Sequence, residues 1–112
     1  MNKDPLRIAH SKADIPIRIT AERWTHVTEN HDYMAGEMDK VIESIENLDV
    51  IVSGNRDEKI ALKHYEKTSI TEKHTVIVYK EQKSQGFLIT AFMTSKPEKI
   101  TSKGILWEKS DD

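Results

Sequence analysis

The chain is most apolar in two neighbouring runs, Val76-Ile77-Val78-Tyr79 and Phe87-Leu88-Ile89-Thr90-Ala91-Phe92-Met93, which the turn residues Ser84-Gln85-Gly86 separate. Nearly continuous apolar runs of this length are typical of central strands that are covered on both faces. Two further strand-like runs, 50–53 and 59–66, precede them around the turn residues Gly54-Asn55. The links between the four runs are too short for crossover helices, so we expect an antiparallel meander.

Two helices are expected before the meander. Thr20 can cap a helix that begins at Ala21, with Ile19 and Trp24 spaced as a hydrophobic staple. One stripe of this helix is expected to be buried and consists of Trp24, Val27, Thr28 and His31. The other is polar, is expected to be exposed and consists of Arg23, His26 and Asn30. Asp32 can cap a second helix, whose apolar positions are Met34, Met38, Val41, Ile42, Ile45 and Leu48.

The ends of the chain complete the expected domain. Residues 1–14 show no sustained period and are expected to form a loose N-terminal arm, residues 15–108 one domain, and residues 109–112 a frayed tail. Ile15, Ile17 and Ile19 alternate with polar residues as in a short edge strand, and the segment around Trp107 can add a last strand. We therefore expect an α+β fold with two N-terminal helices packed on a four- to five-stranded antiparallel sheet.

Composition limits the class of protein. With 112 residues, of which 37% are apolar, the chain can bury one core, and no apolar run is long enough to span a membrane. The first residues lack the apolar stretch of a signal peptide and there is no cysteine, so we expect a cytoplasmic protein. The formal charge of −2 is uneven. Residues 32–55 hold six acidic residues and one lysine, a net −5, and the rest of the chain therefore carries +3.

Histidines are the first candidates for chemistry. His26 and His31 are five residues apart, which turns them by about 140° on a helix, so they do not form a metal-binding pair. No other histidine spacing suits a metal, and we expect neither a metal site nor a cofactor. We expect His26, on the polar stripe, to be freer to exchange a proton than a histidine on the apolar stripe. His31 has two interpretations, a hydrogen-bonded structural residue or a catalytic one.

Other candidates lie in the meander. Arg56 follows a turn, where a guanidinium can hold a phosphate by two hydrogen bonds or serve as plain surface charge. Lys63 and Tyr65 share one face of their strand, which suits anion binding or simple exposure. Thr90 interrupts an apolar strand, and a buried hydroxyl there must find a partner or line a cleft.

Several blocks, taken in order, resemble a known group of domains. They are Glu22-Arg23-Trp24-Thr25-His26-Val27, Asn30-His31, Ile45-Glu46-Asn47, Ser53-Gly54-Asn55-Arg56-Asp57, Gly86-Phe87-Leu88-Ile89-Thr90-Ala91-Phe92 and Gly104-Ile105-Leu106-Trp107. Together they resemble the nuclease-like domains of phages and mobile elements in the superfamily of barnase, EndoU, colicin tRNases and RelE. The resemblance implies a helical part packed on an antiparallel sheet of barnase or RelE type, with a metal-independent RNase site. The chain departs from the pattern at Phe92, where members often have Tyr, and at Asp32, where they often have Pro.

Two functional hypotheses follow. The first is a small toxin-like endoribonuclease that cleaves RNA through the 2′-hydroxyl, with RNA and a cognate antitoxin or immunity protein as partners. Its catalytic residues would be His26, His31, Arg56 and Thr90, and its substrate-binding residues Lys63, Tyr65 and Lys96. The second is a non-catalytic binding module of the same fold with a protein or nucleic-acid partner. Only the enzyme needs the two histidines, Arg56 and Thr90 to converge in one cleft.

Overall fold

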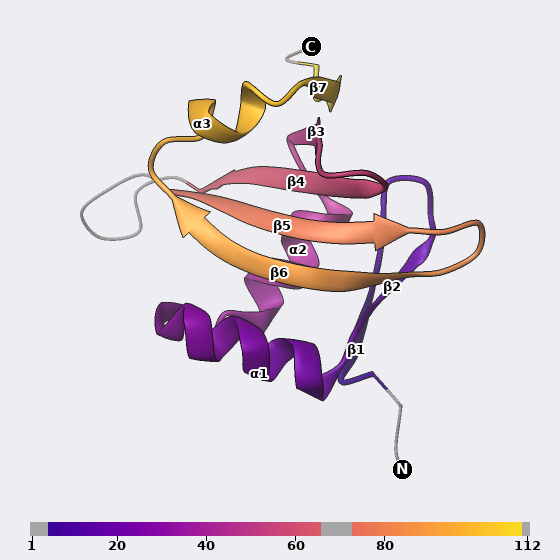
Figure 1. Ribbon diagram of the computed structural model, residues 1–112, viewed down its shortest axis with the longest axis vertical. Helices are drawn as coiled ribbons and strands as arrows, with labels where there is room; N and C mark the ends of the chain where they lie inside the picture. Colours follow the sequence, from indigo (N-terminus) through magenta and orange to yellow (C-terminus); the bar gives the residue numbers. More distant parts are fainter. Residues whose placement is uncertain (1–4, 66–72, 111–112) are drawn as a thin grey trace.

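The computed structural model describes residues 5–65 and 73–110, which form one seven-stranded sheet and three α-helices (Figure 1). The strands are β1 (Arg7–His10), β2 (Pro16–Ile19), β3 (Val50–Ser53), β4 (Glu58–Tyr65), β5 (Lys73–Glu81), β6 (Gly86–Thr94) and β7 (Ile105–Glu108). The helices are α1 (Ala21–Asn30), α2 (Met38–Glu46) and α3 (Glu98–Thr101), and a 3₁₀ helix spans Asp32–Met34. The α+β class agrees with the sequence, but the sheet is larger than four or five strands.

The strand order is β1-β2-β6-β5-β4-β3-β7. Strands β3 to β6 pair antiparallel with their neighbours in sequence, so the expected meander is confirmed. The expectation of a purely antiparallel sheet is wrong, because β2 pairs parallel with β6, at Ile17 with Gly86 and Arg18 with Phe87. Short turns reveal local antiparallel pairing, whereas a parallel pair between distant segments leaves no such sign.

The N-terminal segment is also different from the expected loose arm. Residues 7–10 form β1, which pairs antiparallel with β2, so β2 is not an edge strand. Only Ala9 of this strand is buried, so its sequence shows no alternation to reveal it. The β1–β2 loop is held by the Ser11 N–H, which donates to the Ile15 carbonyl at 2.9 Å, and by Asp14 in the left-handed region at φ 63°.

Helix α1 forms as the sequence predicts. The Thr20 hydroxyl accepts a hydrogen bond from the Arg23 N–H at 3.2 Å and caps the first turn. Val27 is buried and Trp24 packs against the core, while His26 is exposed on the other side. The polar stripe is therefore the solvent-facing one.

Helix α2 begins later than expected. Asp32 starts a 3₁₀ helix and does not cap α2, which begins at Met38. Gly36 lies between them with φ +85°, a left-handed conformation that ends one helical segment before the next begins. The turn at Gly36 sets the direction of α2, which packs against β1, β4 and β5.

Two apolar clusters form on the sheet. The larger one joins Val27 of α1 and Val41 and Ile45 of α2 with strand residues such as Ile51 and Ile77. The smaller cluster lies on the opposite face of the sheet, and Ile100 of α3 packs against it. Its buried members are Val52, Ile60, Leu62 and Val76. Both faces of the central strands are therefore at least partly covered, as their continuous apolar runs predict.

Candidate functional site

The four residues expected to be catalytic lie on separate elements. His26 is exposed on α1, Arg56 is exposed in the β3–β4 turn, and Thr90 lies in β6. Thr90 lies opposite Val78 of β5, which lies opposite Ile60 of β4, four residues beyond Arg56. At about 4.8 Å per strand, the backbones of Thr90 and Ile60 are about 10 Å apart. Arg56 lies farther along, in the turn before β4. Within residues 5–65 and 73–110, no hydrogen bond, ion pair or ring contact joins any two of the four.

His31 occupies a packed position at the C-terminal end of α1. Its ring lies against the rings of Tyr33 and Phe92, with centroids 5.8 and 5.5 Å away, and its Nδ1 is 3.4 Å from the Tyr33 hydroxyl. That hydroxyl accepts the backbone N–H of Met93 at 3.2 Å. Phe92 and Thr90 are two residues apart on β6, so the contact with Phe92 places His31 near Thr90. The ring contacts and the hydrogen bond with Tyr33 favour the structural interpretation of His31.

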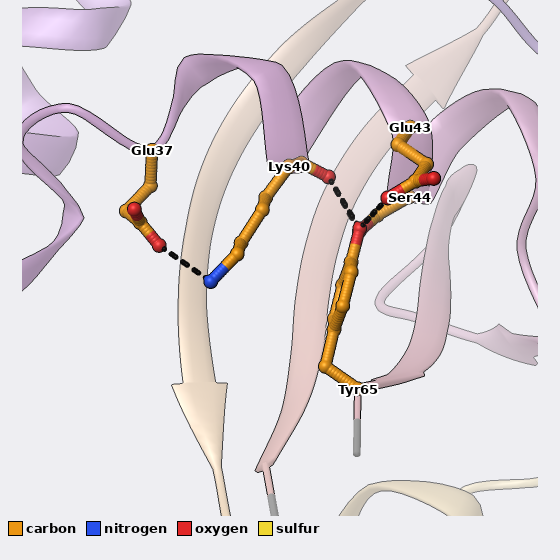
Figure 2. Close-up of polar contacts among 5 residues, drawn as sticks. All are labelled: Glu37, Lys40, Glu43, Ser44 and Tyr65. Atoms are coloured by element: carbon orange, nitrogen blue, oxygen red, sulfur yellow. Dashed lines mark hydrogen bonds and ion pairs between the residues drawn. The ribbon is translucent and has the colours of Figure 1, made fainter. Parts of the chain in front are cut away.

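Two of the substrate-binding candidates connect β4 to α2. Figure 2 shows the Tyr65 hydroxyl donating to the Glu43 carboxylate and lying 3.5 Å from the Lys40 carbonyl. Burial, with this hydrogen bond to Glu43, raises the pKa of Tyr65 well above its ordinary value. The Lys63 Nζ donates to the Asn47 carbonyl at 3.0 Å. These contacts fasten the end of β4 to the helix.

Lys96 is the third substrate-binding candidate. It is exposed just after β6, and its backbone N–H donates to the Thr94 hydroxyl at 3.0 Å. The structure thus brings Lys63 and Tyr65 together, with the Lys63 Nζ 5.8 Å from the centre of the Tyr65 ring. Arg56 lies in the turn before β4, whereas Lys63 lies near the other end of that strand.

A different set of side chains surrounds a pocket of about 200 Å³. Its walls come from the β1–β2 loop and from β3, β4, β5 and β7, which meet at one end of the sheet. The residues that characterise it are Lys12, Ile51, Lys59, Tyr79, Glu81 and Trp107. Strands β1 and β7 are the two opposite edges of the sheet. Lys12 of the β1–β2 loop nevertheless contacts Trp107 of β7, so this loop crosses the end of the sheet and closes the pocket.

A nearly buried carboxylate is the electrostatic centre of the pocket. The Glu81 side chain is only 8% exposed, and it accepts hydrogen bonds from the Ser11 hydroxyl and from the Lys59 Nζ, the latter at 2.5 Å. Burial and then the negative charge of Glu81 raise the pKa of Tyr79. The Lys12 Nζ lies 3.9 Å from the centre of the Trp107 ring, a cation–π contact.

Sequence reasoning missed this pocket. The only sign of the pocket in the sequence is the alternation of strand residues, which places Lys59, Tyr79 and Glu81 on the same sheet face as Ile51. Lys12 and Ser11 come from a loop in the segment that was expected to be unstructured. Their arrival at Glu81 and Trp107 depends on how the β1–β2 loop crosses the sheet, which no local pattern encodes.

The two edge strands are in contrasting surroundings. The His10 N–H of β1 donates to the Glu46 Oε2 of α2 at 2.9 Å, and the Arg7 guanidinium pairs with Asp39 at 3.3 Å. Strand β7 is the other edge, and its Ile105 and Leu106 side chains are 48% and 59% exposed. In Figure 1, β7 lies beside α3 at the top of the molecule, and α1 lies beside β6 at the bottom.

Comparisons with known proteins give no match: no family model fits the chain, and neither the curated proteins nor the solved structures include a similar one. The resemblance to barnase-type domains therefore rests on the sequence blocks alone. Among residues 5–65 and 73–110, no three histidine, aspartate or glutamate side chains gather as metal ligands would, and no helix has the length and apolarity to cross a membrane.

Proposed function

We propose that this chain is a non-catalytic binding module and that it binds an extended segment of a partner protein along β7. The observation that supports the proposal is the difference between the two edges of the sheet. A free edge strand presents unpaired backbone groups that pair readily with another extended chain, and proteins usually cover such edges. Here α2 covers β1, and within the described residues β7 has no such cover.

The backbone of β7 has groups directed outward. The Lys109 N–H donates to the Asp49 carbonyl of the segment that leads into β3, at 2.7 Å. Hydrogen bonding alternates along an antiparallel pair, and Val50 is paired with Glu108. The Glu108 N–H and C=O therefore point away from β3, toward an incoming strand.

The exposed side chains of β7 favour an apolar protein segment. Ile105 and Leu106 offer apolar contact, whereas residues 96–112 hold four lysines and four acidic residues and favour neither sign of charge. An extended segment with apolar side chains matches this strand. RNA is a weaker match, because it cannot continue a sheet and the chain as a whole carries −2.

The endoribonuclease hypothesis stays a prediction. It requires a proton acceptor and a cation at one phosphate, whereas His26 and Arg56 lie on separate elements without a contact between them. This separation favours the binding module. An RNA cleavage assay between about pH 5 and 8, where a histidine base titrates, distinguishes the two functions.

The binding test uses a random-peptide display library and two variants at one position. Glu108→Pro removes the outward N–H of β7 without taking a donor from the β3 ladder, and Glu108→Ala keeps that N–H. We expect selected peptides to be extended segments rich in apolar residues. They should bind wild type and Glu108→Ala alike and lose at least tenfold in affinity for Glu108→Pro, while the melting temperatures of both variants stay close to wild type.

Three results would contradict the proposal. Selected peptides that bind Glu108→Pro as well as wild type would show that β7 does not pair with them. If no peptide is selected and the protein self-associates through β7, the strand that pairs with β7 comes from a second copy of this chain and not from a partner protein. RNA cleavage that is lost in His26→Ala would restore the enzyme hypothesis.

A further inference from the structure

We propose that the pocket between Lys12, Lys59 and Trp107 is a binding site for a small organic carboxylate with a compact apolar body. The pocket uses one side chain of β7, that of Trp107, and none of the outward backbone groups of that strand, so it does not depend on the proposed function. The pocket has a volume of about 200 Å³ and combines two ammonium groups with an aromatic wall. Each of these features limits the ligand.

The charges favour an anion. Glu81 is already engaged by Lys59 and by the Ser11 hydroxyl, so its negative charge is compensated inside the protein. Within the described part of the chain, Lys12 has no carboxylate partner and its ammonium group rests on the Trp107 ring. The three pocket charges sum to +1. A ligand carboxylate can pair with Lys12 and accept a further N–H of Lys59, because each ammonium group has three donors.

The walls limit the body of the ligand. Ile51, Tyr79 and the Trp107 ring form the apolar side of the pocket. Its volume is below the range of drug-sized sites, about 300 to 1,000 Å³, so the ligand has roughly ten non-hydrogen atoms. The Lys12 ammonium group already lies over the Trp107 ring, so the apolar body of the ligand packs beside that ring and against Ile51 and Tyr79. An aromatic monocarboxylate fits these limits.

The same chemistry has two sources, a free metabolite-sized carboxylate or the C-terminal residue of a peptide. Benzoate is the probe for the first source, with benzamide as its neutral match. For the second source, a short peptide ending in phenylalanine is compared with its C-terminal amide. Binding is followed by the two-dimensional NMR signals of the Trp107 indole and of the backbone around Lys59.

Two variants at Lys12 provide the control for charge. Lys12→Gln removes the ammonium group of an exposed loop side chain, and Lys12→Arg keeps a cation there. We expect benzoate to shift the Trp107 and Lys59 signals, benzamide to shift them at least tenfold more weakly, and Lys12→Gln to lower benzoate affinity at least tenfold. Lys12→Arg should stay within a few-fold of wild type. Lys83→Gln, a change at an exposed lysine of the β5–β6 turn, should have no effect.

The test of the pocket can fail or succeed independently of the test of β7 pairing. Glu108→Pro should bind benzoate as wild type does, so failure of β7 pairing leaves the pocket proposal standing. Equal binding of benzoate and benzamide would overturn it, because charge would then play no part. Shifts that persist in Lys12→Gln, or no shifts with either the free acid or the peptide at millimolar concentration, would also overturn it.

Discussion

Lys59 and Glu81 form an ion pair between neighbouring strands, with 2.5 Å between the Lys59 Nζ and the Glu81 Oε1. The two ends differ in exposure: 37% of the Lys59 side chain is accessible but only 8% of the Glu81 side chain. Lys59 is paired with Tyr79 in the register of β4 and β5, and Glu81 follows two residues later on the same face. The pair therefore holds a carboxylate inside the end of the sheet, where it also fixes the β1–β2 loop through Ser11.

Replacing Lys59 by methionine should destabilise the protein. It leaves the Glu81 carboxylate buried without its cation, and an unsatisfied buried charged group costs about 2 kcal/mol of unfolding free energy. The double variant Lys59→Met/Glu81→Met should be less destabilised than Lys59→Met alone, because the buried charge is gone. Urea unfolding of the three proteins measures this, and a double variant that is the least stable would show that the pair itself stabilises.

Replacing Thr75 by valine should leave stability unchanged or raise it. Thr75 is 1% exposed, and its hydroxyl has no hydrogen-bond partner among the described residues. Valine has nearly the same shape and removes a buried polar atom that gains nothing in the fold. Thermal unfolding of Thr75→Val and of Thr75→Ala makes the comparison. Only the alanine variant should melt lower, since it also loses a methyl group from the core.

Replacing Thr20 by alanine should weaken the start of α1. The Thr20 hydroxyl caps the helix by accepting the Arg23 N–H, and loss of such a cap typically costs about 1 kcal/mol. Thr20→Ser keeps the oxygen and serves as the matched control. Denaturant unfolding should place Thr20→Ser near wild type and Thr20→Ala below it. Equal stability of the two variants would assign the cap no role.

Stability should fall in strongly alkaline solution, and Tyr65→Phe should reduce that fall. Burial and Glu43 raise the pKa of Tyr65 in the folded protein above its ordinary value of 10.0. Folding therefore favours the protonated phenol. This contribution is fully present below about pH 10 and is lost as pH rises above it. Tyr79 behaves in the same direction, so Tyr65→Phe should flatten the slope of unfolding free energy between about pH 10 and 11 without abolishing it.

Local patterns were sufficient for much of the fold. The cap at Thr20, the start of α1 at Ala21 and the bounds 50–53 and 86–94 agree with the structure, because each depends on residues within one or two turns or one strand. The last strand around Trp107 is also confirmed. Asp32 was predicted to cap α2, which in fact begins at Met38, because an apolar period of 3.6 residues continues through Gly36 and hides the break there.

The candidate site shows the limit of such reasoning. The catalytic candidates were chosen by residue type and by resemblance. Neither of these predicts how far apart the residues lie in the fold. Lys59, Tyr79 and Glu81 could be placed on one face of the sheet by alternation, but the pocket needs Lys12 and Ser11 as well. Those two residues lie in a loop whose path depends on its contacts with β5 and β7.

The sequence by itself determined helix α1, the presence of a second helix after it, the meander and the alternation of buried and exposed side chains, because periods of 3.6 and two residues and short turns are local properties of the chain. Only the tertiary structure decided that β2 pairs with β6, that α2 covers β1 while β7 stays open, and that Glu81 is buried beside Lys59. The physical reason is that these pairings join segments distant in sequence. Their stability comes from the packing of the whole sheet and its helices, which no single segment carries.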